Sequence, residues 1–345
     1  MTIPILAITI PTFNRAEHIG ALLHSLIPQG QQLAIHICDN ASTDDTVKIA
    51  QQYAQHFAVF TYHIHPENIG APLNFLAAAS MVQSPYSLIC GSDDVLLAEF
   101  IPSVLALLQT LPAPDIIYAS YMACDYYLKP LVAVPSLSAR SDQVFNLHNE
   151  QDIADFFCLM SPKTPIFSLI SSIIFKTDRF QAHVAQAQNF ADTAYTHIYP
   201  LFAMLQEGAI VHYLATPQLL HRGNNSFLFQ ANDKKSFIGR DYAKRWCVDY
   251  EGYAKLAEMF SQPATKLALM NGIHQHIIRI RLTLPKGLIK TRLYSNAEYW
   301  KKLQHHMKKY GHIPFTMRLA GLIPAYWGRK LVKLLYIVAQ QPSSQ

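Results

Sequence analysis

The sequence predicts an α/β protein with a mostly parallel sheet, helices on both faces of that sheet, and a basic helical region at the carboxyl end. Short apolar runs alternate with amphipathic segments through the first 120 of 345 residues. This order is typical of parallel strands joined by crossover helices. Hydrophobic residues make up 50% of the chain, so it can bury a large core.

The amino-terminal elements follow from the residue patterns in chain order. A helix over 15–26 is predicted by apolar residues at helical spacing, namely Ile19, Leu22, Leu23 and Leu26. Ser42, with Asp45 three positions later, predicts the start of another helix. Apolar runs predict strands at 5–10, 33–38, 59–63, 86–90 and 115–120, and further helices are predicted at 71–82 and 99–109.

Beyond residue 120 the pattern is less regular, and prolines mark several loops. Helices are predicted at 150–157 and 196–206, and strands at 168–175 and 210–214. After residue 236 the chain reads as helical and basic, ending in an apolar stripe of Leu331, Leu334, Leu335 and Val338.

Charge is distributed unevenly along the chain. Residues 1–229 hold 8 Lys and Arg against 17 Asp and Glu, a net charge of −9, whereas residues 230–345 hold 20 against 6, a net charge of +14. Such asymmetry indicates that the basic part meets an anionic surface, although solvated helix faces are the alternative. The basic part lacks a recognised nucleic-acid-reading module and an evident series of stacking aromatics, which argues against DNA or RNA as its partner.

Other features exclude several classes of protein. The five cysteines are widely spaced without a Cys-x-x-Cys pair, which favours a reduced, cytoplasmic protein over a disulfide scaffold. The amino terminus lacks the basic segment of a signal peptide. No apolar stretch approaches the roughly 20 residues of a spanning helix. No Gly-x-Gly-x-x-Gly follows the first strand, which argues against a dinucleotide-dependent oxidoreductase.

Three polar loops follow predicted strands, at 11–15, 39–42 and 92–94. Each alone could be an ordinary turn or helix cap. Because the carboxyl ends of parallel strands meet at one edge of a sheet, we expect the three loops to form a ligand site. Asp93 and Asp94 repel each other and lose hydration beside a buried strand. A hard divalent cation, Mg²⁺ or Mn²⁺, would relieve both costs.

Together these segments resemble family 2 glycosyltransferases of the bacterial surface-polysaccharide type, which have the Rossmann-like GT-A fold. The resemblance covers about residues 1–225 and is best over 1–120. It rests on Ile-Pro-Thr-Phe-Asn-Arg at 10–15, Cys-Asp-Asn-Ala-Ser-Thr-Asp-Asp-Thr at 38–46, Asn68-Ile69-Gly70 with Asn74, and Gly-Ser-Asp-Asp at 91–94.

The resemblance implies roles for individual residues. Asp39 would read the base of a nucleotide-sugar donor. Asp94 would be the best metal ligand, Asp93 would contact the ribose or the metal shell, and His221 would complete that shell. Ser92 stands where the family often has a first aspartate. The other residues expected to bind the donor are Pro11, Thr12, Asn14, Arg15, Asn68, Gly70, Asn74, Ser92 and Arg222.

The general base is where the sequence departs from the family. The family usually places a Glu-Asp pair ahead of a glycine and a strand. Counting back from Gly208, that register falls on Thr196 and His197. His197 is a suitable base because an ordinary imidazole titrates near neutrality. Asp192 is the alternative, and both residues also have ordinary structural readings.

The resemblance implies an inverting, metal-assisted glycosyltransferase that uses a nucleotide-sugar donor, with UDP favoured, and a glycan or lipid-linked glycan acceptor. The expected organisation is a GT-A domain over 1–229, with a nucleotide half at 1–120 and an acceptor half at 121–229, followed by the basic region 230–345. That region would hold a cytoplasmic enzyme peripherally on the inner face of an anionic membrane. A non-catalytic sugar-nucleotide binder and a nucleic-acid-binding protein are the alternatives.

Overall fold

The structure is a computed structural model that describes residues 3–110, 112–223, 242–278 and 297–311. The apolar stripe expected at 331–338 lies outside these residues, as does the expected domain boundary at 229/230.

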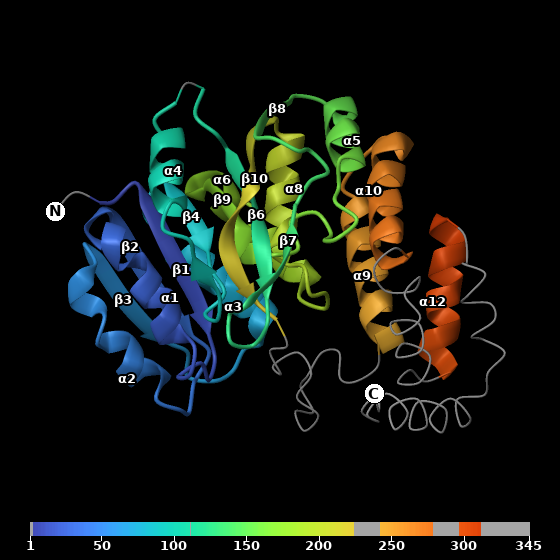
Figure 1. Ribbon diagram of the computed structural model, residues 1–345. Coiled ribbons are helices and arrows are strands. Elements are labelled where there is room, and N and C mark those ends of the chain that lie inside the picture. Colours follow the sequence, from blue (N-terminus) through green and yellow to red (C-terminus); the bar gives the residue numbers. More distant parts are fainter. Residues whose placement is uncertain (1–2, 111, 224–241, 279–296, 312–345) are drawn as a thin grey trace, which may run out of the picture.

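A ten-stranded sheet organises the molecule in the order β3-β2-β1-β4-β9-β6-β10-β5, with β7 paired to β6 and β8 paired to β10 (Figure 1). Its first four strands pair in parallel, and Leu6 lies opposite Leu33 on one side and Tyr86 on the other. These strands are β1 (Leu6–Thr12), β2 (Leu33–Asp39), β3 (Val59–Ile64) and β4 (Tyr86–Ile89). The predicted α/β fold is confirmed.

The second half of the sheet mixes directions. β9 runs antiparallel to both β4 and β6, whereas β6 and β10 are parallel. The sequence pattern missed β5, β7 and β8, which are short, and four of the five residues of β7 are exposed. The strands of this half are β5 (Val95–Leu96), β6 (Ile116–Cys124), β7 (Pro130–Val134), β8 (Gln143–Leu147), β9 (Ile173–Lys176) and β10 (Ala209–Arg222).

Helices cover both faces of the sheet, with a large apolar cluster on each face. Ile19 and Phe100 pack with Ile8 in one cluster, while Phe157 and Phe202 pack with Ile173 in the other. The helices are α1 (Ile19–Leu26), α2 (Thr46–Gln51), α3 (Ala71–Ser80), α4 (Phe100–Leu107), α5 (Glu150–Cys158), α6 (Thr177–Gln181), α7 (Val184–Ala187), α8 (Ile198–Gln206), α9 (Tyr242–Ala257), α10 (Pro263–His276) and α12 (Ala297–Tyr310).

Two helices begin four residues later than predicted. The helix expected from residue 15 begins at Ile19, and the helix expected from Ser42 begins at Thr46. The reason is a connection between the two loops: the backbone N–H of Asn14 donates to Ser42 Oγ at 2.8 Å. The prediction that Ser42 starts a helix was therefore wrong, because its hydroxyl serves the neighbouring loop.

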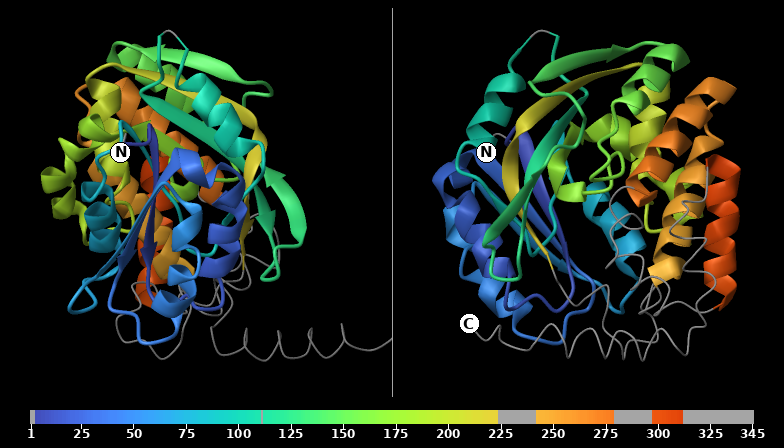
Figure 2. Two further views of the ribbon diagram at one scale, coloured as in Figure 1. Left: turned by 90° about the vertical axis from the view of Figure 1, so that its left-hand side faces the viewer. Right: turned by 45° about the vertical axis from the view of Figure 1, so that its right-hand side comes forward.

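The carboxyl-terminal helices share a core with the sheet domain. α10 packs on α5, and α9 packs on both α10 and α12, so these helices stand side by side (Figures 1 and 2). Trp246, Tyr250, Leu303 and Met307 belong to the same apolar cluster as Phe157. Among the described residues, no helix is both long and apolar enough to cross a membrane.

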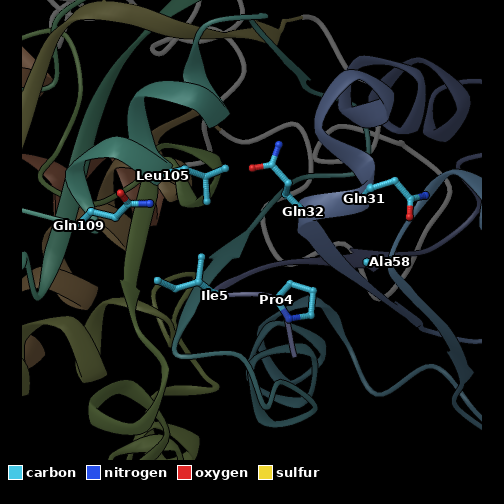
Figure 3. Close-up of a pocket in the computed structure, with 7 residues that line it drawn as sticks. All are labelled: Pro4, Ile5, Gln31, Gln32, Ala58, Leu105 and Gln109. Carbon is cyan, nitrogen blue, oxygen red and sulfur yellow. The ribbon is translucent and has the colours of Figure 1, made fainter. Parts of the chain in front are cut away.

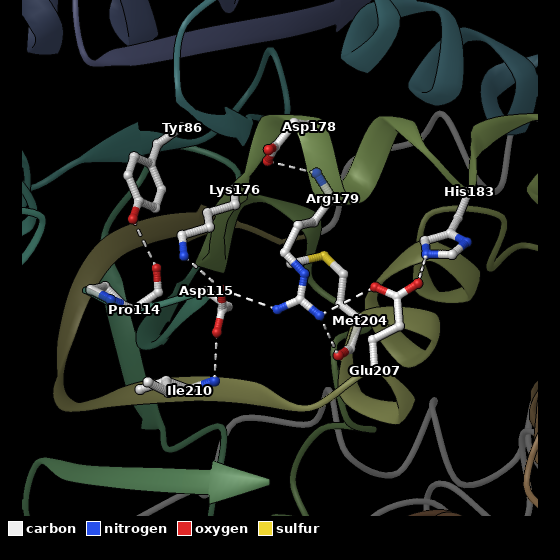
Figure 4. A network of polar contacts seen from close by, with 10 residues as sticks. All are labelled: Tyr86, Pro114, Asp115, Lys176, Asp178, Arg179, His183, Met204, Glu207 and Ile210. Carbon is white, nitrogen blue, oxygen red and sulfur yellow. Dashed lines mark hydrogen bonds and ion pairs between the residues drawn. The ribbon is translucent and has the colours of Figure 1, made fainter. Parts of the chain in front are cut away.

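An ion-pair network ties together the amino ends of β6 and β10 and the carboxyl end of β9 (Figure 4). Asp115 accepts from Lys176 Nζ at 2.8 Å, from Arg179 Nη1 at 3.0 Å and from the backbone N–H of Ile210 at 2.8 Å. Arg179 continues the network to Glu207 at 3.2 Å. The network fixes the edge of this half-sheet opposite the predicted ligand site.

Candidate active site

The first two polar loops meet at the carboxyl edge of the sheet, as the sequence predicted. Asn14 Oδ1 accepts from the backbone N–H of Thr43 at 2.8 Å, and the backbone N–H of Asn40 donates to the carbonyl of Thr12 at 2.9 Å. Asn14 takes a φ of 50°, a left-handed conformation that asparagine tolerates better than most residues. Pro11 and Thr12 are buried at the end of β1.

Asp39 is buried at the end of β2 with both carboxylate oxygens occupied. Oδ1 accepts from the backbone N–H of Ser42 at 2.8 Å, and Oδ2 accepts from the hydroxyl of Tyr62 at 2.6 Å. Burial, together with Asp39, raises the pKa of Tyr62, so Tyr62 stays a neutral donor. The two bonds fix the orientation of the Asp39 carboxylate. The sequence pattern does not point to Tyr62, because this residue looks like an ordinary strand residue.

The segment around Asn68 joins the same loops through side-chain amides. Asn40 Nδ2 donates to Asn68 Oδ1 at 2.8 Å, and the backbone N–H of Gly70 donates to the same oxygen at 2.9 Å. Asn74 Nδ2 donates to the carbonyl of Cys38 at 3.0 Å. Gly70 takes a φ of 87°, a conformation that favours glycine. Asn40, a member of the predicted polar loop at 39–42, is the link between these loops.

The carboxylate of Asp94 lies at the junction of three segments and is 2% exposed. Oδ1 lies 2.9 Å from His221 Nδ1 and accepts from the backbone N–H of Arg222 at 3.2 Å, both at the end of β10. Oδ2 accepts from Ser171 Oγ at 2.6 Å. Burial lowers the pKa of His221, but the charge of Asp94 and its hydrogen bond raise that pKa by more.

Asp93 lies on the same turn, and its side chain comes close to that of Asp94. A Cβ added to Gly91 would lie 3.2 Å from both Asp93 Oδ1 and Asp94 Oδ2, so the two carboxylates converge above this glycine. Burial and the charge of Asp94 raise the pKa of Asp93 to about 6, although Arg15 and His221 oppose the rise. Ser92, the preceding residue, is buried.

Arg222 connects the acidic turn to the hairpin between β6 and β7. Its Nε donates to the carbonyl of Asp93 at 3.0 Å, and its Nη1 donates to the carbonyl of Tyr126. Arg222 is 8% exposed. The Arg222 guanidinium, predicted to bind the donor, thus holds two backbone segments together in this structure.

The two candidate bases lie in different surroundings. His197 is 4% exposed at the start of α8, and its Nε2 donates to the carbonyl of Phe167 at 3.1 Å. Among the described residues, its Nδ1 has no hydrogen-bond partner. Burial lowers the pKa of His197 to about 4. Asp192 is largely exposed and forms an ion pair with Lys255 at 2.8 Å.

The residues at the acidic turn fit a small divalent cation whose shell a phosphate would complete. Within the described ranges, no three His, Cys, Asp or Glu side chains are arranged so that they could hold a metal ion by themselves. Mg²⁺ commonly takes one or two carboxylates together with substrate phosphates, at about 2.1 Å. The contact of 2.9 Å between Asp94 Oδ1 and His221 Nδ1 is a hydrogen bond in this structure, so a cation bound by both side chains would take the place of the shared proton.

A separate hollow of about 530 Å³ lies at the opposite edge of the sheet (Figure 3). It is lined by residues that precede the first three strands, including Ile5, Gln32 and Ala58, and by Leu105 and Gln109 of the α4 region. No charged side chain and none of the predicted site residues line it. We therefore place the candidate site at the carboxyl edge, where the polar loops and the acidic turn lie.

Comparisons with known proteins show what the chain is similar to. Residues 7–160 match the sequence model of Glycosyl transferase family 2. The abequosyltransferase RfbV of Salmonella typhimurium is 28% identical over 320 residues, which cover 89% of this chain and 90% of RfbV. An uncharacterized glycosyltransferase of Mycoplasma pneumoniae, an MG025 homolog, is 31% identical over 103 residues, covering 29% of this chain and 34% of that protein.

Solved structures show the same fold. TarS 1–349 of S. aureus in complex with UDP superimposes with a TM-score of 0.56 at 12% identity, covering 94% of this chain and 87% of that chain. The same protein in complex with UDP-GlcNAc gives a TM-score of 0.54 at 14% identity, covering 88% and 83%. Residues 7–160 thus match the model of family 2 glycosyltransferases, the fold is of the GT-A type, and the protein is a glycosyltransferase.

Proposed function

We propose that the protein is an inverting, metal-assisted glycosyltransferase that moves a sugar from a nucleotide-sugar donor to a hydroxyl group of a glycan or lipid-linked glycan. The observation that carries the proposal is the convergence of Asp93, Asp94 and His221, with Asp93 in charge interaction with Arg15 of the first polar loop. The division into a GT-A domain over 1–229, with nucleotide and acceptor halves, and a basic region over 230–345 belongs to the same proposal.

The donor would lie along the carboxyl edge of the sheet. Asp39, held by Ser42 and Tyr62, would accept a hydrogen bond from the base. The cluster of Asn40, Asn68 and Gly70 would support the ribose and phosphates. This assignment gives each rigid loop one part of the donor, and rigid loops lose little entropy when a ligand binds.

A diphosphate leaving group gains negative charge in the transition state. Mg²⁺ or Mn²⁺, held by Asp94, His221 and the outer carboxylate Asp93, would stabilise that charge as a Lewis acid. The role of the chain is to hold the ligand atoms in place. The backbone N–H of Arg222 and the hydroxyl group of Ser171, which both donate to the Asp94 carboxylate, do so. Arg15, close to Asp93 in charge interaction, adds positive charge on the donor side.

His197 is the general base in this proposal, in preference to Asp192. The carbonyl of Phe167 accepts only, so Nε2 carries the proton and Nδ1 presents a lone pair. One ring nitrogen is thus oriented by a carbonyl while the other can accept a proton, as general bases require. A pKa of about 4 keeps that lone pair unprotonated at neutral pH but also makes it a weak base, so binding of the acceptor would have to raise this pKa for efficient proton transfer.

Calorimetry on the full chain tests the donor site. We would titrate UDP, CDP, GDP and dTDP with and without Mn²⁺ into the wild type, Asp94→Ala and the control Asp155→Ala, which alters an exposed carboxylate on α5. We expect one nucleotide to bind in a Mn²⁺-dependent manner to the wild type and the control, but not to Asp94→Ala. Binding that is indifferent to both Mn²⁺ and Asp94 would refute the metal-assisted mechanism.

The donor sugar and the acceptor extend the proposal. The name of the Salmonella relative makes abequose the first sugar to try, and UDP is the first nucleotide, because TarS was solved with UDP and UDP-GlcNAc. Transfer would be followed by mass spectrometry of a lipid-linked glycan acceptor. The stereochemistry of the new bond, read by NMR, tests inversion.

The basic region would rest on the anionic inner face of a membrane and keep the cytoplasmic enzyme near a lipid-linked acceptor. α12 supports this assignment, because Trp300, Leu303 and Met307 are buried while its lysines are exposed. Those lysines are Lys301, Lys302, Lys308 and Lys309. Each basic residue near such a surface contributes about 1 kcal/mol. Flotation with phosphatidylserine vesicles, compared with phosphatidylcholine vesicles, tests this contact, and equal binding to both would refute it.

A further inference from the structure

Asp94 is surrounded by hydrogen-bond donors from three different segments. His221 and the Arg222 backbone contact Oδ1, and Ser171 contacts Oδ2. An ionised carboxylate has about four lone-pair positions. If His221 binds the metal ion instead of Asp94, two donors to the Asp94 carboxylate remain. They leave a lone pair of Asp94 for the metal ion and still fix the plane of the carboxylate. Of these two, Ser171 alone donates from a side chain.

The proton of the Ser171 hydroxyl group has a defined direction. The backbone N–H of Gly91 donates to Ser171 Oγ at 2.8 Å. Because an amide N–H can only donate, Ser171 must accept there, and its own O–H points to Asp94 Oδ2 at 2.6 Å. The bond to a carboxylate is charge-assisted and therefore stronger than one between neutral groups. Gly91, Ser171 and Asp94 form a directed relay.

The relay is buried and belongs to the sheet rather than to a loose loop. Ser171 is 0% exposed and lies in the 3-10 turn Ile170–Ser172, directly before β9. β9 pairs with β4, the strand that leads into the acidic turn. Ser171 therefore approaches Asp94 from a strand that is fixed against the turn, so its hydroxyl group cannot be replaced by water without rearrangement.

We infer that Ser171 is a positioning residue that orients Asp94 for the divalent cation. This inference rests on the proposed function, because it assumes that Asp94 binds a cation with the donor diphosphate. Groups that hydrogen-bond to a metal ligand commonly change metal affinity by about 10- to 100-fold when they are removed. The chain provides a matched control in Ser172, which is equally buried but donates to the carbonyl of Leu169 at 2.7 Å instead.

The test compares Ser171→Ala with Ser172→Ala in the full chain. The probe is Mn²⁺ with UDP, or with whichever of CDP, GDP and dTDP binds the wild type, and calorimetry gives nucleotide affinity with Mn²⁺ and with a chelator. We expect Ser171→Ala to weaken Mn²⁺-dependent binding about 10- to 100-fold and to leave chelator-treated binding unchanged. Ser172→Ala should stay within about threefold of the wild type, because it does not touch Asp94.

The alternative outcomes separate the two proposals. Mn²⁺-dependent binding that is unchanged in Ser171→Ala, or equally weakened in both variants, overturns the role of Ser171 while the proposed function stands. Absence of Mn²⁺-dependent binding in the wild type overturns the proposed function itself. Thermal melts establish that the variants fold. If Ser171→Ala does not fold, Ser171→Cys replaces it, because a thiol keeps the volume but is a weak donor, and the same loss of affinity is expected.

Discussion

Replacing His197 with glutamine should change how the stability of the protein depends on pH. Burial lowers the pKa of His197 from 6.5 to about 4, whereas the unfolded chain keeps a value near 6.5. Between these values the unfolded state binds a proton that the folded state does not, so stability falls as the pH falls. The full contribution is present above pH 6.5 and is lost as the pH drops towards 4.

The size of the effect follows from the two pKa values. At about 1.4 kcal/mol per pKa unit, the difference between 6.5 and about 4 corresponds to about 3 kcal/mol of unfolding free energy between pH 7 and pH 4. His197→Gln cannot take up this proton, and its amide can still donate to the carbonyl of Phe167. The other histidines are common to both proteins, and their contributions cancel in the comparison.

Urea denaturation followed by tryptophan fluorescence, at several pH values from 7 to 4, measures this difference. We expect the wild type to lose about 3 kcal/mol more than His197→Gln over this range. The exposed His305 provides the control, since His305→Gln should follow the wild type. A constant difference between the wild type and His197→Gln at every pH would refute the buried, neutral state of His197 and with it the oriented Nδ1 lone pair.

Three further predictions concern other contacts. Asp115→Ala should cost about 2–3 kcal/mol of unfolding free energy, because two basic side chains and a buried N–H lose their acceptor. Glu207→Ala, at an exposed end of the network, should cost less than about 1 kcal/mol. Equal losses of unfolding free energy in urea titrations of the two variants would contradict this ranking. Tyr62→Phe should weaken nucleoside diphosphate binding about tenfold, measured by calorimetry, because Asp39 loses one donor. An unchanged affinity would show that Tyr62 does not orient the Asp39 carboxylate for binding. Asn149→Ala should lower stability by about 1 kcal/mol, because Asn149 Oδ1 caps α5 through two backbone N–H groups, and an unchanged urea midpoint would count against that cap.

The strands of the first half-sheet could be predicted because their information is local. A fully buried parallel strand requires an unbroken apolar run, and β1 and β2 are buried at every residue. The loops after these strands had to meet at one edge once the strands were parallel. The pattern could not predict β7, because most of its side chains are exposed and its pairing with β6 holds it in place.

The sequence by itself determined the α/β fold, the polar edge and the acidic pair, because each depends on residues that are neighbours in the chain. The tertiary structure decided which groups complete that edge. Ser171 reaches Asp94 across 77 positions in sequence, and Tyr62 reaches Asp39 across 23. It also decided the state of His197, because the burial that lowers its pKa comes from the packing of distant segments. A local pattern specifies a strand or a turn, whereas the direction of a proton and the cost of a charge depend on what the fold brings beside them.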